Sequence, residues 1–146
     1  MKKILFLFAL GFALLSCGGN AKQETAAQAT QEAVETDGVE VLYFHGKQRC
    51  ATCIAIEKHA REAVEAAFAD AVKRGEVTFR IIDISQPENQ ALAEKYEVTW
   101  SSLFVVKHQG GKETAENLTE FAFGNARKSP DAFKDSVIAA VNKMLK

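Results

Sequence analysis

Residues 39–53 read VEVLYFHGKQRCATC and change character twice along their length. A short run of β-branched, aliphatic and aromatic residues predicts a buried strand: Val39, Val41, Leu42, Tyr43 and Phe44. The polar segment from His45 to Arg49 predicts a loop. From Ala51 onward the period changes, and apolar residues at helical spacing predict an amphipathic helix whose inner face is Ile56, Ala60, Ala63, Val64, Ala67, Phe68 and Ala71. Cys50 and Cys53 therefore stand where a strand and its loop lead into a long helix.

The chain after this helix alternates between strand and helix signals. Gly75 stands where the helix is expected to stop, and Val77 to Ile84 predicts a second strand. Ser85 and Glu88 resemble a capping box, which makes Ser85 the expected N-cap of a helix that continues to Tyr96. These signals predict a strand–helix–strand–helix order up to the middle of the chain.

The last third of the chain predicts a hairpin and a helix. Leu103 to Val106 is a third strand, the turn follows at 108–111, and Leu118 to Phe123 is the expected hairpin partner. Ser129 is the expected N-cap of the last helix, with Pro130 in its first turn. The order β-α-β-α-β-β-α predicts an α/β fold, in which helices cover both faces of a mixed central sheet.

The spacing and position of Cys50 and Cys53 carry the chemistry of this sequence. At a helix N-terminus, backbone N–H groups without intrahelical partners and the helix dipole both favour an anion. Arg49 adds a positive charge beside Cys50, so we expect the Cys50 thiol pKa to fall from about 8.5 toward about 7 or below. Cys50 is then the candidate nucleophile for disulfide exchange, and Cys53, one turn later, is the candidate resolving thiol.

Other uses of the pair remain open from the sequence. Two cysteines at this spacing can form half of a zinc site, but that site needs two more ligands and no second cysteine pair exists. The nearby histidines are His45, which can approach from the loop, and His59, which points about 240° around the helix from Cys53. An inert disulfide or an idle motif is the remaining alternative. We expect no resident cofactor.

The N-terminus predicts export and lipid attachment. Lys2 and Lys3 precede the apolar run Ile4 to Leu15, which reads as a signal peptide and is shorter than the roughly 20 residues that span a bilayer. Leu14-Leu15-Ser16-Cys17 resembles a bacterial lipobox, and this resemblance implies cleavage after residue 16 and a lipid anchor on Cys17. The alternative is a plain signal peptide with an incidental cysteine. Lipidation of Cys17 would also account for the odd count of three cysteines.

Composition divides the rest of the chain into two parts. Residues 17–37 are rich in Gly, Ala, Gln, Thr and Glu and predict a lipidated, flexible tether, whereas residues 38–146 predict one folded domain. Without residues 1–16 the chain holds 16 basic and 19 acidic residues, a net charge of −3. This charge gives no indication of nucleic acid as a partner.

Residues Val39 to Leu145 resemble a thioredoxin-superfamily domain. The resemblance rests on the strand–loop–CxxC–helix unit, on the strands FRIID at 79–83 and LFVVK at 103–107, and on the Gly110-Gly111 hairpin. The text YFHGKQRCATC is also similar to a narrower group of small exported thioredoxin-like proteins, some of which are labelled as subunits of a nitrophenyl-compound nitroreductase. No flavin or nicotinamide fingerprint accompanies it here.

Three departures from the thioredoxin pattern bear on the site. Thioredoxins place a cis-proline opposite the dithiol, whereas this chain has Ser102 there, for which a cis bond costs about 2.5–4 kcal/mol. This loss weakens the expectation of general thioredoxin activity and slightly favours metal binding. Arg-Cys-Ala-Thr-Cys also replaces Trp-Cys-Gly-Pro-Cys, so the family's reduction potential does not carry over. The first strand lacks the family's buried acid, and Tyr43 and Phe44 occupy that region.

Two further residues are candidates for supporting roles. His45, whose unperturbed pKa is about 6.5, is a candidate for the missing proton relay, and a solvated loop histidine is the alternative. Trp100 is a candidate apolar platform for a partner's disulfide, or else a core residue. The resemblance and the residues together predict a thiol–disulfide oxidoreductase of the bacterial cell envelope. Its expected partners are protein thiols or disulfides and a membrane or envelope redox protein. The alternative is a binding module that holds a metal or cluster, or a non-catalytic redox subunit.

Overall fold

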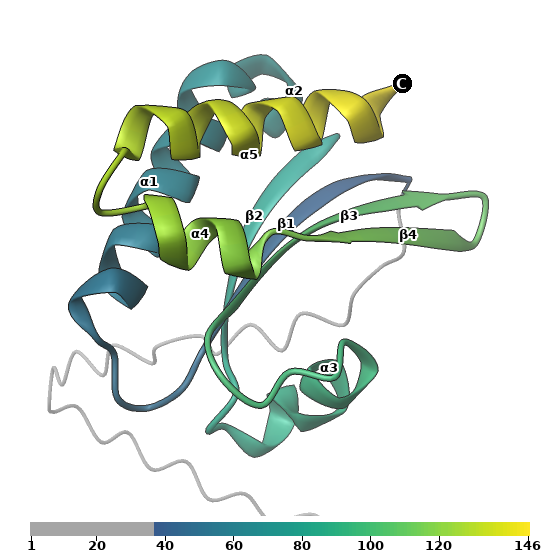
Figure 1. Cartoon of the computed structure of the whole chain (residues 1–146). Helices are drawn as coiled ribbons and strands as arrows, with labels where there is room; N and C mark the ends of the chain where they lie inside the picture. Colours follow the sequence, from purple (N-terminus) through teal and green to yellow (C-terminus); the bar gives the residue numbers. More distant parts are fainter. Residues whose placement is uncertain (1–36) are drawn as a thin grey trace, which may run out of the picture. The chain divides into compact units, whose positions relative to one another are not determined.

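The computed structural model describes residues 37–146, drawn in colour in Figure 1. Its elements are, in order, β1 (Gly38–His45), α1 (Ala51–Ala67), α2 (Ala69–Lys73), β2 (Val77–Asp83), a 3₁₀ turn (Pro87–Asn89), α3 (Gln90–Lys95), β3 (Ser102–Gln109), β4 (Lys112–Asn117), α4 (Thr119–Asn125) and α5 (Pro130–Leu145). The predicted signal peptide, the lipid site at Cys17 and nearly all of the predicted tether lie outside the described residues.

One mixed sheet organises these elements, with strand order β2-β1-β3-β4. β1 and β2 are parallel because the α1 crossover returns the chain to the same end, whereas β3 runs antiparallel to both β1 and β4. Figure 1 shows α1, α4 and α5 on one side of the sheet and α3 on the other. The expected α/β architecture, with helices on both faces of a mixed sheet, is confirmed.

Alternation along the central strands divides the core into two parts. Val41 and Tyr43 of β1 belong to the cluster beneath α1 and α5, while Leu42 and Phe44 face the smaller cluster beside α3. All four side chains are fully buried, so β1 is covered on both faces. This burial explains why the sequence of β1 is nearly continuously apolar rather than alternating. It also fixes the position of the loop that follows β1, and that loop carries the two cysteines.

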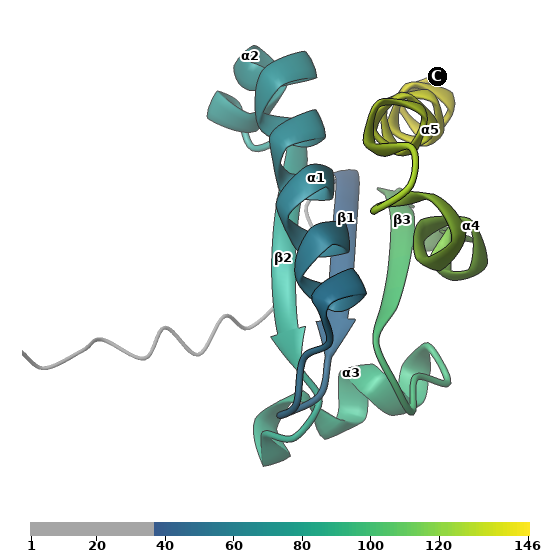
Figure 2. The ribbon, with the colours of Figure 1, turned by 60° about the vertical axis from the view of Figure 1, so that its left-hand side comes forward.

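Helix α1 begins where the chain leaves β1 and turns back along the sheet. Figure 2 shows its first turn next to the end of β1 toward which the strand arrow points. The predicted single helix is interrupted at Phe68, so that the short α2 follows α1. Gly75 ends this helical segment as expected: it has φ 73°, and the amides of Gly75 and Glu76 bond back to the carbonyls of Val72 and Ala71.

The hairpin prediction was wrong in its second strand. The partner of β3 is Lys112–Asn117, whereas most of the predicted strand Leu118–Phe123 lies in α4. β4 is an edge strand with mostly exposed, polar side chains, so it lacks an alternating apolar signal. Leu118, Ala122 and Ala126 are instead buried at helical spacing of four residues.

The predicted cap of the middle helix was also wrong. Ser85 does not cap it; the Ser85 amide and hydroxyl both donate to Asp83 Oδ1, at 2.9 and 2.7 Å. The helix instead starts one residue later as a 3₁₀ turn whose N-cap, Gln86, makes no side-chain cap bond. Asp83 takes the hydrogen bonds that Ser85 would otherwise make as a cap, because its carboxylate stands two residues before the free Ser85 amide, the geometry of an Asx-turn.

The last helix is capped only in part as expected. Ser129 stands at the N-cap of α5, but its side chain makes no cap bond. Among the described residues, no helix is long and apolar enough to cross a membrane.

Candidate redox site

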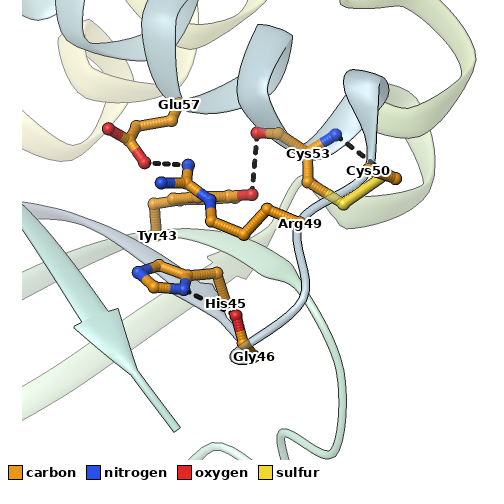
Figure 3. Close-up of a disulfide and its surroundings, with 7 residues drawn as sticks. All are labelled: Tyr43, His45, Gly46, Arg49, Cys50, Cys53 and Glu57. Atoms are coloured by element: carbon orange, nitrogen blue, oxygen red, sulfur yellow. Dashed lines mark hydrogen bonds and ion pairs between the residues drawn. A yellow bond between two sulfur atoms is a disulfide. The ribbon is translucent and has the colours of Figure 1, made fainter.

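The Cys50 sulfur caps helix α1. Cys50 is the N-cap residue in extended conformation, and its Sγ accepts a hydrogen bond from the Cys53 amide at 3.1 Å. A disulfide joins Cys50 to Cys53, with the two Cα atoms 5.0 Å apart (Figure 3). The predicted placement of the pair at a helix N-terminus is therefore confirmed. A sulfur anion formed at Cys50 would meet both a backbone donor and the positive end of the helix dipole.

The two sulfur-bearing residues differ in exposure. Cys50 is exposed, whereas Cys53 lies in the first turn with 7% of its surface exposed. A large partner can therefore approach Cys50 from solvent but has little access to Cys53. This asymmetry suits an outer sulfur that exchanges with a partner and an inner sulfur that reacts only with the outer one.

Tyr43, near the end of β1, supports the first turn of α1, which carries the two cysteines and is called the dithiol turn below. Its side chain is fully buried under α1, and its hydroxyl donates to the Cys53 carbonyl oxygen at 2.8 Å. Burial raises the pKa of the Tyr43 phenol, and the neighbouring Ser101 hydroxyl and the Arg49 charge offset part of this rise. Tyr43 is thus a neutral donor that holds the first turn of α1 against the sheet.

The Arg49 side chain reaches from the loop to Tyr43 and Glu57. Its guanidinium lies over the Tyr43 ring, 5.8 Å from the ring centroid, and forms an ion pair with Glu57 (Figure 3). Glu57 also accepts from Arg61 at 3.3 Å. The guanidinium that we expected to act on Cys50 is thus paired with a carboxylate of α1. This pairing weakens the effect of Arg49 on a thiolate.

The two histidines nearest the cysteines in the sequence, His45 and His59, take local partners. The His45 ring faces the Tyr43 ring at a centroid distance of 6.1 Å, and His45 Nδ1 lies 2.9 Å from the Gly46 carbonyl oxygen, to which it donates. His59 Nδ1 lies 3.2 Å from a Glu62 carboxylate oxygen. Within residues 37–146, no three His, Cys, Asp or Glu side chains gather as a group that could hold a metal ion. A metal on the cysteine pair would therefore need ligands from elsewhere.

The segment before β3 approaches the dithiol turn through Ser101. Ser101 is buried beside the Tyr43 hydroxyl, and the next residue, Ser102, is buried and donates from Oγ to the Trp100 carbonyl oxygen at 3.1 Å. All peptide bonds within residues 37–146 are trans, including that of Ser102. Trp100 is 57% exposed and packs one side against Phe123, at a centroid distance of 5.0 Å, so it is not a core residue.

Comparisons with known proteins find only distant likenesses. No protein family model and no curated protein matches the chain. An uncharacterised thioredoxin-like protein from Clostridium perfringens, solved in solution, is 12% identical with a TM-score of 0.49, over 85% of this chain and 91% of that one. Chloroplastic thioredoxin z is 16% identical with a TM-score of 0.39, over 59% of this chain and 76% of that one.

The fold is defined by the strand order β2-β1-β3-β4 and by the cysteine pair at the N-terminus of α1. The chain has a thioredoxin-like fold with a CxxC disulfide.

The sequence predicted both cysteines of the site but not three residues around them: Tyr43, Glu57 and Ser101. Glu57 was within reach of sequence reasoning, because it follows Cys53 by four residues and so lies on the same helix face. The role of Tyr43 depends on a contact between β1 and α1, which no local pattern reveals.

Proposed function

We propose that this protein is a thiol–disulfide oxidoreductase in which Cys50 attacks and Cys53 resolves. The observation that carries the proposal is the place of Cys50: the residue is exposed, and its sulfur accepts a hydrogen bond from the Cys53 amide at the N-terminus of α1. A backbone donor and the helix dipole stabilise the thiolate, which is the form that attacks a disulfide. The buried inner cysteine, one turn away, is placed to complete the exchange.

The exchange proceeds in two balanced steps from the reduced protein. Cys50 thiolate attacks one sulfur of a partner disulfide, the partner S–S bond breaks, and its other sulfur leaves as a thiolate that takes up a proton. Cys53 then loses its proton and attacks Cys50 Sγ, which releases the second partner sulfur as a thiol and forms the Cys50–Cys53 disulfide. Two electrons pass from this protein to the partner. The reverse sequence oxidises a partner dithiol.

A trapping experiment tests the assigned roles. A Cys53→Ser variant lacks the resolving thiol, so it should accumulate mixed disulfides with partner proteins from the native envelope, and dithiothreitol should release them. The matched control is Cys50→Ser, which keeps one cysteine of the pair but places it where a partner has little access. If Cys53→Ser gives no adducts, or if Cys50→Ser traps the same partners equally well, the assigned roles are wrong.

We also propose that the protein works at the bacterial cell envelope, held by lipid on Cys17. The support is the motif Leu14-Leu15-Ser16-Cys17 after an apolar run with two leading lysines. A Cys17→Ala variant should lose incorporation of labelled fatty acid and leave the membrane fraction. The dithiol should react as before, because Cys17 is not part of the pair. Unchanged fatty-acid labelling of this variant would contradict the anchor.

A further inference from the structure

A cavity of about 670 Å³ opens beside the segment that precedes β3. It lies between that segment, the end of β4 and the beginning of α4, and its volume falls within the range of roughly 300–1,000 Å³ typical of ligand sites. Four aromatic side chains contribute to its lining: Tyr96, Trp100, Phe104 and Phe123. Because Trp100 is 57% exposed, one face of its indole remains available to an occupant.

Within residues 37–146, the charged groups that line this cavity are acidic. They are Glu97 and Glu120, both exposed, and no Lys, Arg or His of this part of the chain joins them in the lining. Within residues 37–146 neither carboxylate takes part in an ion pair, although most acidic side chains on α1 and β4 do so. Carboxylates next to exposed aromatic faces favour a cation, through charge pairing and through attraction to the ring quadrupole.

The same surface offers partners for a peptide backbone. β4 is the edge strand of the sheet, and its last residue, Asn117, lines the cavity. Asn117 Oδ1 accepts from the Thr119 amide, which leaves the side-chain NH₂ able to donate to an incoming carbonyl. An extended segment of another protein can therefore lie at this edge while one of its side chains enters the cavity.

A series of contacts links the cavity to the first turn of α1, which carries the cysteines. Ser102 lines the cavity, and the preceding Ser101 is buried beside the Tyr43 hydroxyl. That hydroxyl donates to the Cys53 carbonyl. The short segment 100–102 thus separates the cavity from the turn that carries the cysteines. A protein held at Cys50 can extend over this segment to the cavity.

We propose that this cavity binds the guanidinium or ammonium group of an Arg or Lys side chain on the protein partner whose disulfide reacts with Cys50. Trp100 and Phe123 stack against the cationic group, and Glu97 and Glu120 balance its charge. The identity of the occupant as a redox partner rests on the proposed function. The binding of a cationic side chain does not, because it needs no reaction at the cysteines.

The single tryptophan of the chain gives a direct measurement, because it forms part of the cavity wall. The oxidised full chain is titrated with acetyl-Gly-Arg-Gly-amide and with the same peptide containing citrulline, a neutral isostere of arginine. The arginine peptide should change Trp100 emission in a saturable way and bind about three- to tenfold more tightly than the citrulline peptide. No saturable change, or equal affinity of the two peptides, would overturn the proposal.

Variants that neutralise the cavity carboxylates test whether the arginine peptide binds in this cavity. Glu97→Gln and Glu120→Gln should each weaken the arginine peptide roughly two- to fivefold and leave the citrulline peptide unchanged. The matched control is Glu65→Gln, which removes an exposed carboxylate from α1 away from the cavity lining and should have no effect. An effect of the control as large as that of both cavity variants would reduce the result to net charge and overturn the proposal.

A kinetic arm separates this proposal from the proposed function. The reduced chain is mixed with two disulfide peptides that differ only in arginine or citrulline next to the cysteine, and the arginine peptide should react about three- to tenfold faster. If the binding preference holds but the two rates are equal, the occupant is not the disulfide partner and this inference is wrong. If neither peptide reacts, the proposed function fails, and the binding measurements still decide whether the cavity takes a cation.

Discussion

Replacing Glu57 by glutamine should make Cys50 more acidic. Glu57 holds the Arg49 guanidinium by an ion pair, so part of the positive charge next to Cys50 is balanced by a carboxylate on α1. The Glu57→Gln variant would keep the size of the side chain and a hydrogen-bond acceptor for Arg49 but lose the negative charge. The Cys50 thiolate would then experience less repulsion from α1 and more of the Arg49 field. Both changes lower the Cys50 pKa.

The magnitude follows from helix geometry. Glu57 comes seven residues after Cys50, which is almost two turns, so the two lie on one side of α1 and about 10 Å apart along its axis. A unit charge at about 10 Å contributes about 0.4 kcal/mol at the dielectric of water and about 1.7 kcal/mol at an effective value of about 20. Side chains exposed by 28% and 18% belong between these limits. The expected fall in the Cys50 pKa is therefore about 0.3 to 1.2.

The pH dependence of thiol alkylation measures this pKa. The reduced protein is reacted with iodoacetamide at a series of pH values, and the pKa of Cys50 is taken from the rate profile. The control is Glu65→Gln, which removes an exposed carboxylate eight residues further along α1, about 12 Å more distant. It should leave the profile unchanged. An unchanged or raised Cys50 pKa in Glu57→Gln would refute the electrostatic reasoning, because the substitution removes only negative charge.

Two further predictions concern stability. Burial raises the pKa of both tyrosines, Tyr43 and Tyr96, above their unfolded values, so the protein should lose stability as pH rises through about 10, where the unfolded chain ionises first. Phenolate absorbance should appear together with the loss of helical circular dichroism; phenolate at about pH 10 in the folded protein would contradict this. Glu97 has φ 54° at the end of α3, so Glu97→Gly should raise the free energy of unfolding by up to about 1 kcal/mol, while Gly75→Ala should lower it by about 1 kcal/mol. Urea unfolding measures both changes, and the same sign for the two would contradict the backbone argument.

The sequence predicts those parts of the fold that local physics dominates. Strand β1 and helix α1 have strong and different apolar periods, and Gly75 ends a helix by the same backbone bonds that glycine favours. Helix α3 ends in the same way at Glu97, with the Val98 amide bonded to the Ala93 carbonyl. No glycine marks that second ending, so sequence reasoning could place it only approximately, near Tyr96.

The wrong hairpin partner shows where local physics stops. β4 contributes backbone to the sheet but almost no side-chain burial, so nothing in Lys112–Asn117 marks it as a strand. The apolar residues that follow belong mostly to α4, which packs against α5, α1 and β3. A segment that pairs only through its backbone is specified by its neighbours: the turn at Gly110 and Gly111 fixes the register, and β3 supplies the partner groups.

The candidate redox site, like the fold, has a part that local sequence predicts and a part that it does not. The position of Cys50 at the start of α1 follows from the sequence, because the strand, the loop and the helix are all local signals. The surroundings that set its chemistry are not local: Tyr43 reaches the Cys53 carbonyl from β1, and Arg49 reaches Glu57 two turns along α1. From the sequence, Arg49 could be assigned only to Cys50, because the two residues are adjacent in the chain and the contact with Glu57 is not visible there.

With the Glu57 carboxylate balancing Arg49, the main stabilisation of a Cys50 thiolate comes from the backbone of α1 rather than from Arg49. Removing both charges, Arg49→Met together with Glu57→Gln, should therefore change the Cys50 pKa by less than either substitution alone, because the two opposite charges offset each other at Cys50. The same alkylation profile measures all three variants. A rise of the Cys50 pKa in the double variant as large as in Arg49→Met alone would show that the guanidinium, and not the helix terminus, is the main source of the field at Cys50.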